Sequence, residues 1–183
     1  MKVAVLFKEG FEPIEALTVV DVCARAKVPC VMIGMDHLEV KSSHGIVVKM
    51  DQLYDESDLD FDMVVLPGGL PGATNLQADE RVINLLKKMN NDKKWIAAIC
   101  AGPISLETAG VVEGKKFTCY PGFEKEIPSG IYSSSLVEVD QNIITGRGPA
   151  GTLAFAYTIL ECLGFDSKGI QDGMQYTYLK ENI

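Results

Sequence analysis

Cys100 is the residue of this sequence best placed to do chemistry. It follows the apolar run 97–99, and the small residues Ala101 and Gly102 come directly after it. Small neighbours let the backbone turn sharply and leave the thiol at the apex of the turn. The dipole and unpaired amides of a helix starting just beyond would favour the thiolate. We therefore predict a reactive thiol, against the alternative of a buried structural cysteine, the commonest fate of free Cys.

Glu15 is the expected partner of Cys100. It lies in the first turn of a predicted helix, where a carboxylate is favourable. A parallel sheet would place that turn above the same edge as Cys100. The carboxyl could then hydrogen-bond the thiolate or its oxidised forms. The alternative is a solvent-exposed acid at a helix start, which is what we expect for Glu9 and Glu12.

A glycine-rich turn at 67–72 is the third candidate feature. Its sequence, Pro-Gly-Gly-Leu-Pro-Gly, holds three glycines and two prolines in six residues. Turns of this kind bring backbone amides close to a ligand. We predict that the amides of Gly69 and Ala101 stabilise an oxyanion or a sulfinate. A plain tight turn is the alternative.

The positions of the histidines argue against one class of enzyme. His37 and His44 are the two histidines of the chain, and both precede Cys100. Cysteine peptidases and glutamine amidotransferases with a strand-Cys-helix arrangement need a histidine as base. A peptidase-like relative would place it directly after the cysteine, where this chain has Ala101. A Cys-His-Glu hydrolase is therefore not expected.

The segment 146–151 matches the dinucleotide-binding pattern G-x-G-x-x-G. Dinucleotide sites normally use the first strand–helix turn, whereas this segment lies near the C-terminus and no convincing strand follows its helix. We expect a turn that starts the last core helix, in which Arg147 could help to shape a pocket.

Composition and cysteine usage set the broad class. The chain has 183 residues, of which 47% are hydrophobic and 23% charged, and its formal charge is 17 − 25 = −8. We expect one globular domain over 1–183, with no electrostatic reason to bind nucleic acid or an anionic membrane and no spanning segment. Five cysteines with irregular spacing and no C-x-x-C pair predict neither a disulfide framework nor a metal site. Free thiols without a signal peptide indicate the cytoplasm.

The elements that must position these residues alternate along the chain. Apolar runs predict strands, one of them part of a hairpin, at 2–7, 30–34, 46–50, 63–66, 95–99, 116–119, 136–139 and 143–145. Helical patterns cover 14–26, 79–89, 104–109 and 152–163, with a weakly patterned helical tail at 169–183. This alternation predicts a doubly wound α/β fold with a mostly parallel sheet covered on both faces.

Several motifs together resemble the DJ-1 branch of the ThiJ/PfpI superfamily. They are the segments 10–15, 64–69, 97–103 and 147–149, and the resemblance runs essentially from end to end. It implies a flavodoxin-like sandwich with a small hairpin, a homodimer, and no metal or organic cofactor. By position, Cys100 corresponds to the oxidisable nucleophile and Glu15 to the acid that hydrogen-bonds it. Gly69 and Ala101 correspond to amide contributors, and Arg25 to a dimer-interface arginine near the pocket.

Two positions depart from the family pattern. Tyr120 stands in Thr-Cys-Tyr-Pro, where many relatives carry a histidine. Tyrosine is a poor general base near neutral pH, although it could orient a substrate or donate a hydrogen bond, so Glu15 must carry more of the proton transfer. His44 stands where relatives often have an arginine that approaches the partner subunit's pocket. We consider a role for His44 across the dimer, against a surface hairpin histidine.

The resemblance implies several functions that use the same thiol. Relatives are described as redox sensors, chaperones, cofactor-free glyoxalases that convert methylglyoxal to lactate, and deglycases of early glycated protein or nucleotide. Our leading hypothesis is a cysteine-dependent enzyme acting on small aldehydes or glycated substrates through Cys100, with Glu15 moving protons. The alternative is an oxidative-stress sensor or chaperone in which Cys100 becomes a sulfinate. An inactive scaffold is a third possibility, which no residue strongly favours.

Overall fold

A seven-stranded sheet forms the centre of the computed structural model, which describes residues 1–58 and 60–182. Within these residues the strand order is β10-β11-β7-β6-β1-β2-β5, and only β10 runs antiparallel to its neighbour. The strands are β1 (Val3–Phe7), β2 (Cys30–Gly34), β5 (Gln52–Leu53), β6 (Met63–Leu66), β7 (Trp95–Ile99), β10 (Val137–Asp140) and β11 (Ile143–Gly146). The predicted doubly wound, mostly parallel sheet is confirmed.

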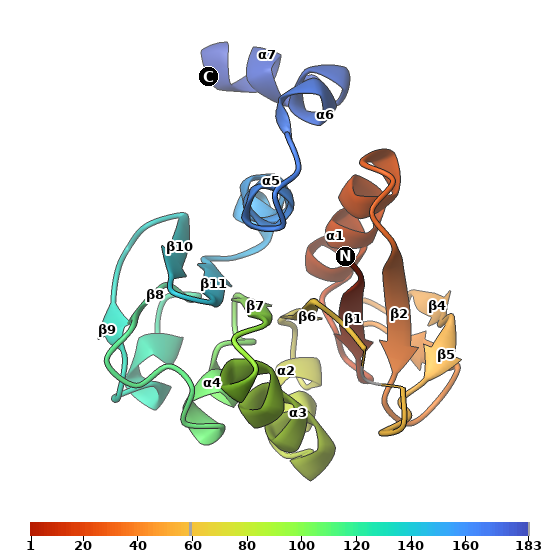
Figure 1. Ribbon diagram of the computed structural model, residues 1–183, viewed down its shortest axis with the longest axis vertical. Helices are drawn as coiled ribbons and strands as arrows, with labels where there is room; N and C mark the ends of the chain where they lie inside the picture. Colours follow the sequence, from red (N-terminus) through yellow and green to blue (C-terminus); the bar gives the residue numbers. More distant parts are fainter. Residues whose placement is uncertain (59, 183) are drawn as a thin grey trace.

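The central strands are apolar because helices cover both faces of the sheet (Figure 1). On one face, a hydrophobic cluster packs beneath α1 (Pro13–Arg25) and α5 (Thr152–Cys162). On the other face, a second cluster packs beneath α2 (Gly72–Gln77), α3 (Glu80–Asn91) and α4 (Ile104–Thr108). All five residues of β1 are fully buried, as expected for a strand covered from both sides.

Strand register aligns the three loops that carry the candidate residues. Val65 of β6 pairs with Val5 of β1 on one side and with Ala97 of β7 on the other. All three strands are parallel, so their carboxyl ends meet at one edge of the sheet. The loops that follow them, 8–12, 67–71 and 100–103, therefore start side by side.

Smaller elements flank the main sheet. β3 (Glu39–Lys41) and β4 (Val47–Lys49) form the predicted antiparallel hairpin, and β8 (Lys116–Phe117) pairs with β9 (Ile131–Tyr132). Two short 3-10 helices, η1 (Phe123–Glu126) and η2 (Pro149–Gly151), complete the connections. The strand predicted at 116–119 ends at Phe117, because Thr118 hydrogen-bonds to groups outside the β8–β9 pair. The Thr118 N–H donates to Thr145 Oγ1 at 2.9 Å, and the Thr118 hydroxyl donates to the carbonyl of Ser135.

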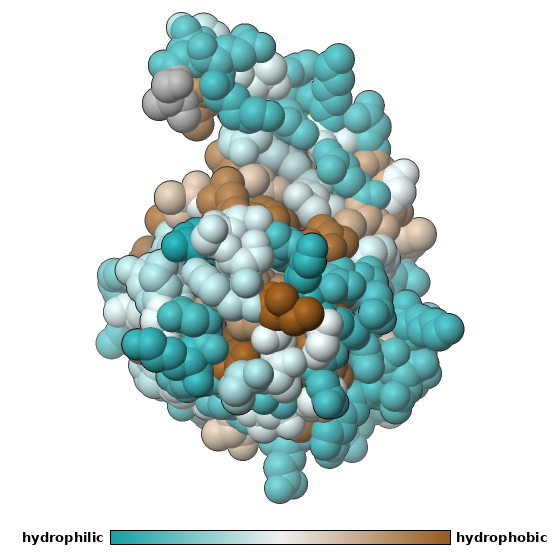
Figure 2. Space-filling model, turned by 90° about the vertical axis from the view of Figure 1, so that its left-hand side faces the viewer, coloured by the Kyte–Doolittle hydropathy of each residue, from teal (hydrophilic) through white to brown (hydrophobic). Residues whose placement is uncertain are grey.

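The C-terminal segment forms two short helices, α6 (Lys168–Gly173) and α7 (Tyr176–Glu181), where one helical stretch over 169–183 was predicted. Residue 183 lies outside the described residues. The two helices extend beyond α5 as a separate lobe (Figures 1 and 2). Tyr157 of α5 contacts both helices. Its ring centroid lies 5.0 Å from that of Tyr176, and its hydroxyl donates to Met174 Sδ at 3.4 Å. No helix among the described residues is both long and apolar enough to cross a membrane.

Candidate functional site

The loops after β1 and β6 touch backbone to backbone at the carboxyl edge. The Glu12 N–H donates to the Gly68 carbonyl at 2.9 Å, and the Gly72 N–H donates to the Gly10 carbonyl at 3.2 Å. A Cβ on Gly69, whose φ is +87°, would lie 2.6 Å from the Gly10 oxygen, and one on Gly72 would lie 2.6 Å from Phe11 N. The glycines of the 67–72 turn are therefore what allows the two loops to approach.

Cys100 adopts the sharp turn expected from its small neighbours. Its φ of +62° is in the left-handed region, which is costly for a residue with a side chain. Two neighbours hold it there. The Cys100 N–H donates to the Gly146 carbonyl at 2.9 Å, and the Cys100 carbonyl accepts from the Tyr120 N–H at 3.0 Å. The strained backbone is thus fixed by the ends of β11 and of the segment after β8.

Glu15 is fully buried, and its carboxyl hydrogen-bonds with the Cys100 thiol. Its Oε2 accepts from the Gly68 N–H at 2.7 Å, whereas Oε1 has no nitrogen or oxygen partner among the described residues. A Cβ on Gly68 would lie 2.6 Å from Glu15 Oε2 and 2.7 Å from Cys100 Cβ. Only a glycine at position 68 leaves room for both side chains.

The expectation that Glu12 is a solvent-exposed acid is wrong. Glu12 is 8% exposed and is the N-cap of α1, where its Oε2 accepts from the Glu15 N–H at 2.7 Å. The same residue therefore fixes the backbone of Glu15 and, through its own N–H, the carbonyl of Gly68. The signal that could have identified it is Pro13 at the first helical position, which makes the residue before it the cap.

Glu15 and Cys100 share an environment that disfavours charge. Burial raises the pKa of Glu15 from 4.5 to about 7, and hydrogen bonds from Cys100 and Gly68 offset this only in part. Burial, followed by the charge of Glu15, also raises the pKa of the Cys100 thiol. The backbone amides of Ala101 and Gly69 hydrogen-bond the sulfur and act in the opposite direction. The pair of side chains therefore loses its first proton near pH 7.

The expected source of thiolate stabilisation needs correction. The sequence suggested the dipole of the helix after Cys100, but α4 begins only at Ile104 and spans five residues. What the structure offers instead is the pair of amides from Gly69 and Ala101, the two residues chosen from sequence for that role.

Tyr120 and Arg147 lie together next to the Cys100 backbone. They line a cavity of about 280 Å³ with Pro121, Leu136 and residues 148–151. Tyr120 is 48% exposed, and Arg147 Nη1 donates to the Tyr132 hydroxyl at 3.1 Å and to the Ser134 carbonyl at 3.2 Å. The turn 146–151 itself joins β11 to α5 through η2, as expected for the start of the last core helix.

Arg25 and His44 are not part of the site within one chain. Arg25 is in the last turn of α1, ten residues after Glu15 and thus roughly 15 Å further along the helix, where its Nε donates to Asp21 Oδ2 at 2.8 Å. His44 is exposed at the turn of the β3–β4 hairpin, and its Nδ1 lies 3.1 Å from Ser43 Oγ. Their suggested roles across a dimer stay predictions.

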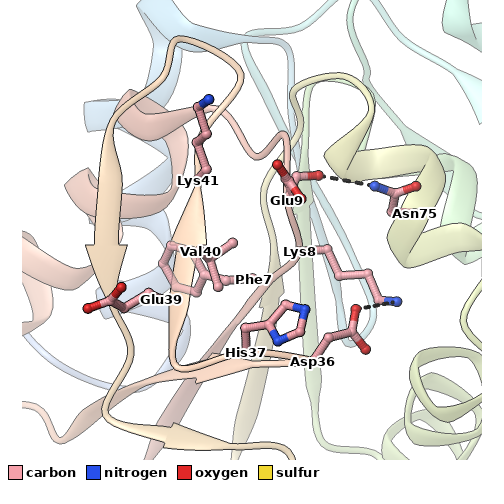
Figure 3. A pocket seen from close by; sticks show the side chains of 9 residues that line it. All are labelled: Phe7, Lys8, Glu9, Asp36, His37, Glu39, Val40, Lys41 and Asn75. Carbon is pink, nitrogen blue, oxygen red and sulfur yellow. Dashed lines mark hydrogen bonds and ion pairs between the residues drawn. The ribbon is translucent and has the colours of Figure 1, made fainter.

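A second cavity, of about 380 Å³, lies beside the hairpin and is lined by Phe7, Lys8, Glu9, Asp36, His37, Glu39, Val40, Lys41 and Asn75 (Figure 3). Lys8 is bound there between Asp36 at 3.1 Å and Asp79 at 2.9 Å. Arg81 also pairs with both carboxylates, so two cations balance two anions. The cavity lining contains none of the predicted site residues. No cluster of three metal-ligating side chains is found in residues 1–58 and 60–182.

The fold and the site together define a class: a doubly wound α/β protein with a strained cysteine in the turn after a central strand, paired to a buried carboxyl. The family model described as the DJ-1/PfpI family matches residues 1–162, and the chain belongs to this family. The family expected from the sequence motifs is thereby confirmed.

Individual relatives agree with this assignment. The chain is 37% identical over 174 residues to Protein DJ-1 homolog B of Arabidopsis thaliana, with 93% of this chain and 40% of the plant protein covered. It thus spans less than half the length of that relative. It is 34% identical over 127 residues to the Pyrococcus horikoshii protein named Deglycase PH1704, covering 68% and 76% of the two chains. The crystal structure of Drosophila melanogaster DJ-1beta matches with a TM-score of 0.90 at 32% identity, covering 95% of this chain and 98% of that one.

Proposed function

We propose that the protein is a cysteine-dependent enzyme that acts on small reactive carbonyls without a metal or organic cofactor. The observation that carries the proposal is the hydrogen-bonded pair of Glu15 and Cys100, with the amides of Gly69 and Ala101 directed at the sulfur. This arrangement combines a nucleophile, a base whose pKa is close to neutral, and donors for a developing negative charge. The deglycase name of one relative supports the same class of chemistry.

The chemistry begins with addition of the Cys100 sulfur to the aldehyde carbon of methylglyoxal. Glu15 accepts the thiol proton as the carbon–sulfur bond forms, and the amides of Gly69 and Ala101 lie where they can stabilise the oxyanion. The proton returns to that oxygen and gives a neutral hemithioacetal. Glu15 then moves the proton of the former aldehyde carbon to the neighbouring ketone carbon, through an enediol, to give a thioester. Water releases lactate and restores the thiol, so the net reaction is hydration of methylglyoxal to lactate.

The cavity beside Tyr120 and Arg147 is the proposed place for the rest of the substrate. It is mainly apolar apart from these two side chains, and it adjoins Cys100 through the Tyr120 N–H. Tyr120 replaces the histidine of many relatives, so its hydroxyl is proposed to orient a carbonyl oxygen rather than to act as a base. Proton transfer is thereby left to Glu15.

The test is formation of lactate from methylglyoxal by the purified protein in the absence of glutathione. We expect turnover in the wild type, complete loss in Cys100→Ser, and a loss of about 100-fold or more in Glu15→Gln. Cys162→Ser is the matched control, because it removes a half-buried thiol at the far end of α5 and should retain full activity. A wild-type protein whose Cys100 is alkylated readily but which makes no lactate or other hydroxy acid would contradict the proposal.

One observation favours a second function, that of an oxidative-stress sensor or chaperone with little turnover. Glu15 Oε1 is buried beside Cys100 without a nitrogen or oxygen partner in the described part of the chain. A protonated carboxyl there could donate to an oxygen of a Cys100 sulfinate and hold it. Mild peroxide should then add about 32 Da to Cys100, and Glu15→Gln should change the yield. A Cys100→Ser variant that still gained this mass would remove the sensor hypothesis.

We also propose a homodimer in the cytoplasm as the working form. Exposed apolar side chains on α1 and on the β3–β4 hairpin support the dimer, since Ile14 is 55%, Ile46 51% and Val47 58% exposed. The turn of the hairpin is held beside the start of α1, because the Ser43 N–H donates to the carbonyl of Phe11, two residues before the helix, at 2.9 Å. All five cysteines are free, which supports a reducing compartment.

A further inference from the structure

Two cysteines outside the site lie close together on one face of the sheet. Cys23 belongs to the last turn of α1 and Cys30 is the first residue of β2, and each thiol shifts the pKa of the other. Both belong to the hydrophobic cluster beneath α1 and α5. Cys119, by contrast, is buried in the cluster on the other face of the sheet, and Cys100 lies at the carboxyl edge. The carbonyl chemistry proposed above uses neither Cys23 nor Cys30.

The connection between α1 and β2 fixes the two thiols in this arrangement. The helix ends at Arg25, and Lys27 reverses the chain with a φ of +57°. The Val28 N–H then donates to the Cys23 carbonyl at 2.9 Å, and the Pro29 carbonyl accepts from the Val3 N–H at 2.9 Å. Cys30 is paired with Val3 in the sheet. A tight turn and a strand register therefore place Cys30 in the same layer as Cys23.

We propose that Cys23 and Cys30 form an oxidisable dithiol, a second redox site that closes to a disulfide under peroxide. Two thiols that pack into the same cluster across one tight turn need only a local movement to reach the bonding distance of about 2 Å. Cys23 is 1% exposed, whereas Cys30 is only partly buried, so the oxidant reaches the pair from the side of Cys30. Cys30 lowers the pKa of the Cys23 thiol, which favours Cys23 as the sulfur that closes the disulfide.

The chemistry takes two balanced steps. The Cys30 sulfur attacks one oxygen of hydrogen peroxide as its own proton leaves, the O–O bond breaks, and the products are a sulfenic acid at Cys30 and water. The Cys23 sulfur then attacks the Cys30 sulfur, and the sulfenic hydroxyl leaves with the Cys23 proton as water. Overall, two thiols lose two electrons and two protons, and peroxide becomes two waters. Oxidation at this site removes mass, whereas oxidation of Cys100 to a sulfinate adds oxygen.

Peptide mapping of the oxidised protein tests the proposal. Trypsin cuts after Lys8, Arg25, Lys27 and Lys41, which separates Cys23 in peptide 9–25 from Cys30 in peptide 28–41. Each peptide contains a single cysteine, so only a disulfide can join them. In a Cys100→Ala protein treated with mild peroxide we expect a mass loss of about 2 Da and a joined 9–25/28–41 pair that dithiothreitol separates.

Two variants test whether the joined peptide depends on Cys30. Cys30→Ser should abolish the joined peptide and the mass loss, whereas Cys162→Ser should leave both unchanged. Three outcomes would overturn the proposal: both peptides stay separate and fully alkylated in the treated protein; Cys30 gains oxygen without joining; or the link forms between two chains and appears as a covalent dimer on a non-reducing gel. All three readouts are independent of turnover at Cys100.

Discussion

At the scale of single residues, the candidate site is a pair, Cys100 and Glu15, rather than a cysteine alone. Cys100 and Glu15 were identified from residue type and from their places after strands. Their electrostatics could not be predicted from the sequence, because burial of Glu15 arises only when α1, the 67–72 turn and the Cys100 turn come together. The same holds for Gly68, whose missing side chain makes room for both partners. No local pattern distinguishes it from Gly69.

The raised pKa of Glu15 predicts a pH-dependent stability. Between pH 4.5, its ordinary value, and about 7, its value in the folded protein, the folded state binds more protons than the unfolded state. The stabilising effect of the proton is therefore full below 4.5 and is lost as the pH rises through about 7. Glu15→Gln should lack this loss. The free energy of unfolding of the variant, relative to that of the wild type, should therefore rise by about 3 kcal/mol between pH 4.5 and pH 8. Urea unfolding across this pH range measures the difference. If the free energy of unfolding changes with pH in the same way in both proteins, the prediction is wrong.

The same pair predicts how the Cys100 thiol responds to pH. The first proton leaves the pair near pH 7, so alkylation of Cys100 by iodoacetamide should accelerate as the pH rises through about 7. Glu15→Gln removes the base, and the acceleration should move to the higher pH at which the buried thiol itself ionises. Mass spectrometry of the alkylated protein gives the rate. A profile that is identical in the variant would mean that the two side chains are not coupled.

Gly68→Ala should damage the site directly. The added Cβ would lie within 2.7 Å of both Glu15 Oε2 and Cys100 Cβ, so the loops must separate. We expect a loss of roughly 1–3 kcal/mol in the free energy of unfolding and a slower alkylation of Cys100 at pH 7.5. Gly169→Ala in α6 is the control, because nothing lies within 4 Å of its added Cβ. Equal effects of the two substitutions would contradict the crowding argument.

At the scale of elements, the helices begin where charge and capping allow. The helix pattern predicted over 79–89 starts one residue later, because Asp79 is the N-cap of α3, and its carboxylate accepts from the Arg81 N–H at 3.0 Å. Asp79 also forms an ion pair with Lys8, which belongs to the loop after β1. Burial opposes its ionisation, but hydrogen bonds from Arg81 and Lys8 outweigh burial and lower the pKa of Asp79 to about 2. The Asp79 carboxylate therefore links the start of α3 to the loop after β1.

Asp79→Asn isolates the charge, since asparagine caps a helix about as well as aspartate. We expect a loss of about 2 kcal/mol at pH 7, because Lys8 and Arg81 each lose a buried ionic partner. Asp79 contributes above pH 3.8 and loses that contribution as the pH falls towards about 2, so the difference should shrink in acid. Asp92→Asn, which breaks an exposed ion pair with Lys88 at the other end of α3, is the control and should have little effect.

At the scale of the whole molecule, the alternation of apolar runs was enough to predict the sheet, its mostly parallel strands and its two helical layers. The helices and strands that were not predicted are short: α2, β3, β5 and β9 have two to six residues and no clear periodicity. They form because the larger layers fix their ends. The tail was predicted as one helix, but it divides at Gln175, whose φ of +59° breaks the helical path between α6 and α7.

The proposed dimer makes a prediction at this scale. Ile14→Glu or Ile46→Glu places a charge in the apolar surface shared by α1 and the hairpin and should convert the protein to a monomer. Light scattering after size-exclusion chromatography measures the mass. Ile131→Glu is the matched control, because Ile131 is 54% exposed and β9 lies on the side of the molecule opposite α1 and β4 (Figure 1). Loss of the dimer in the control alone would place the interface elsewhere, and a wild type that is monomeric would contradict the dimer.

The two borders of the main sheet have a consequence for how copies of this protein can associate. β5 has only two residues, and β10 is covered where Asp140 Oδ2 accepts from the Lys116 N–H of β8 at 2.8 Å. Neither border presents a long row of free backbone groups to a strand from another molecule. Edge-to-edge pairing of native molecules through the main sheet is therefore disfavoured at both borders. Copies of this protein should associate through side-chain surfaces rather than by extending the sheet.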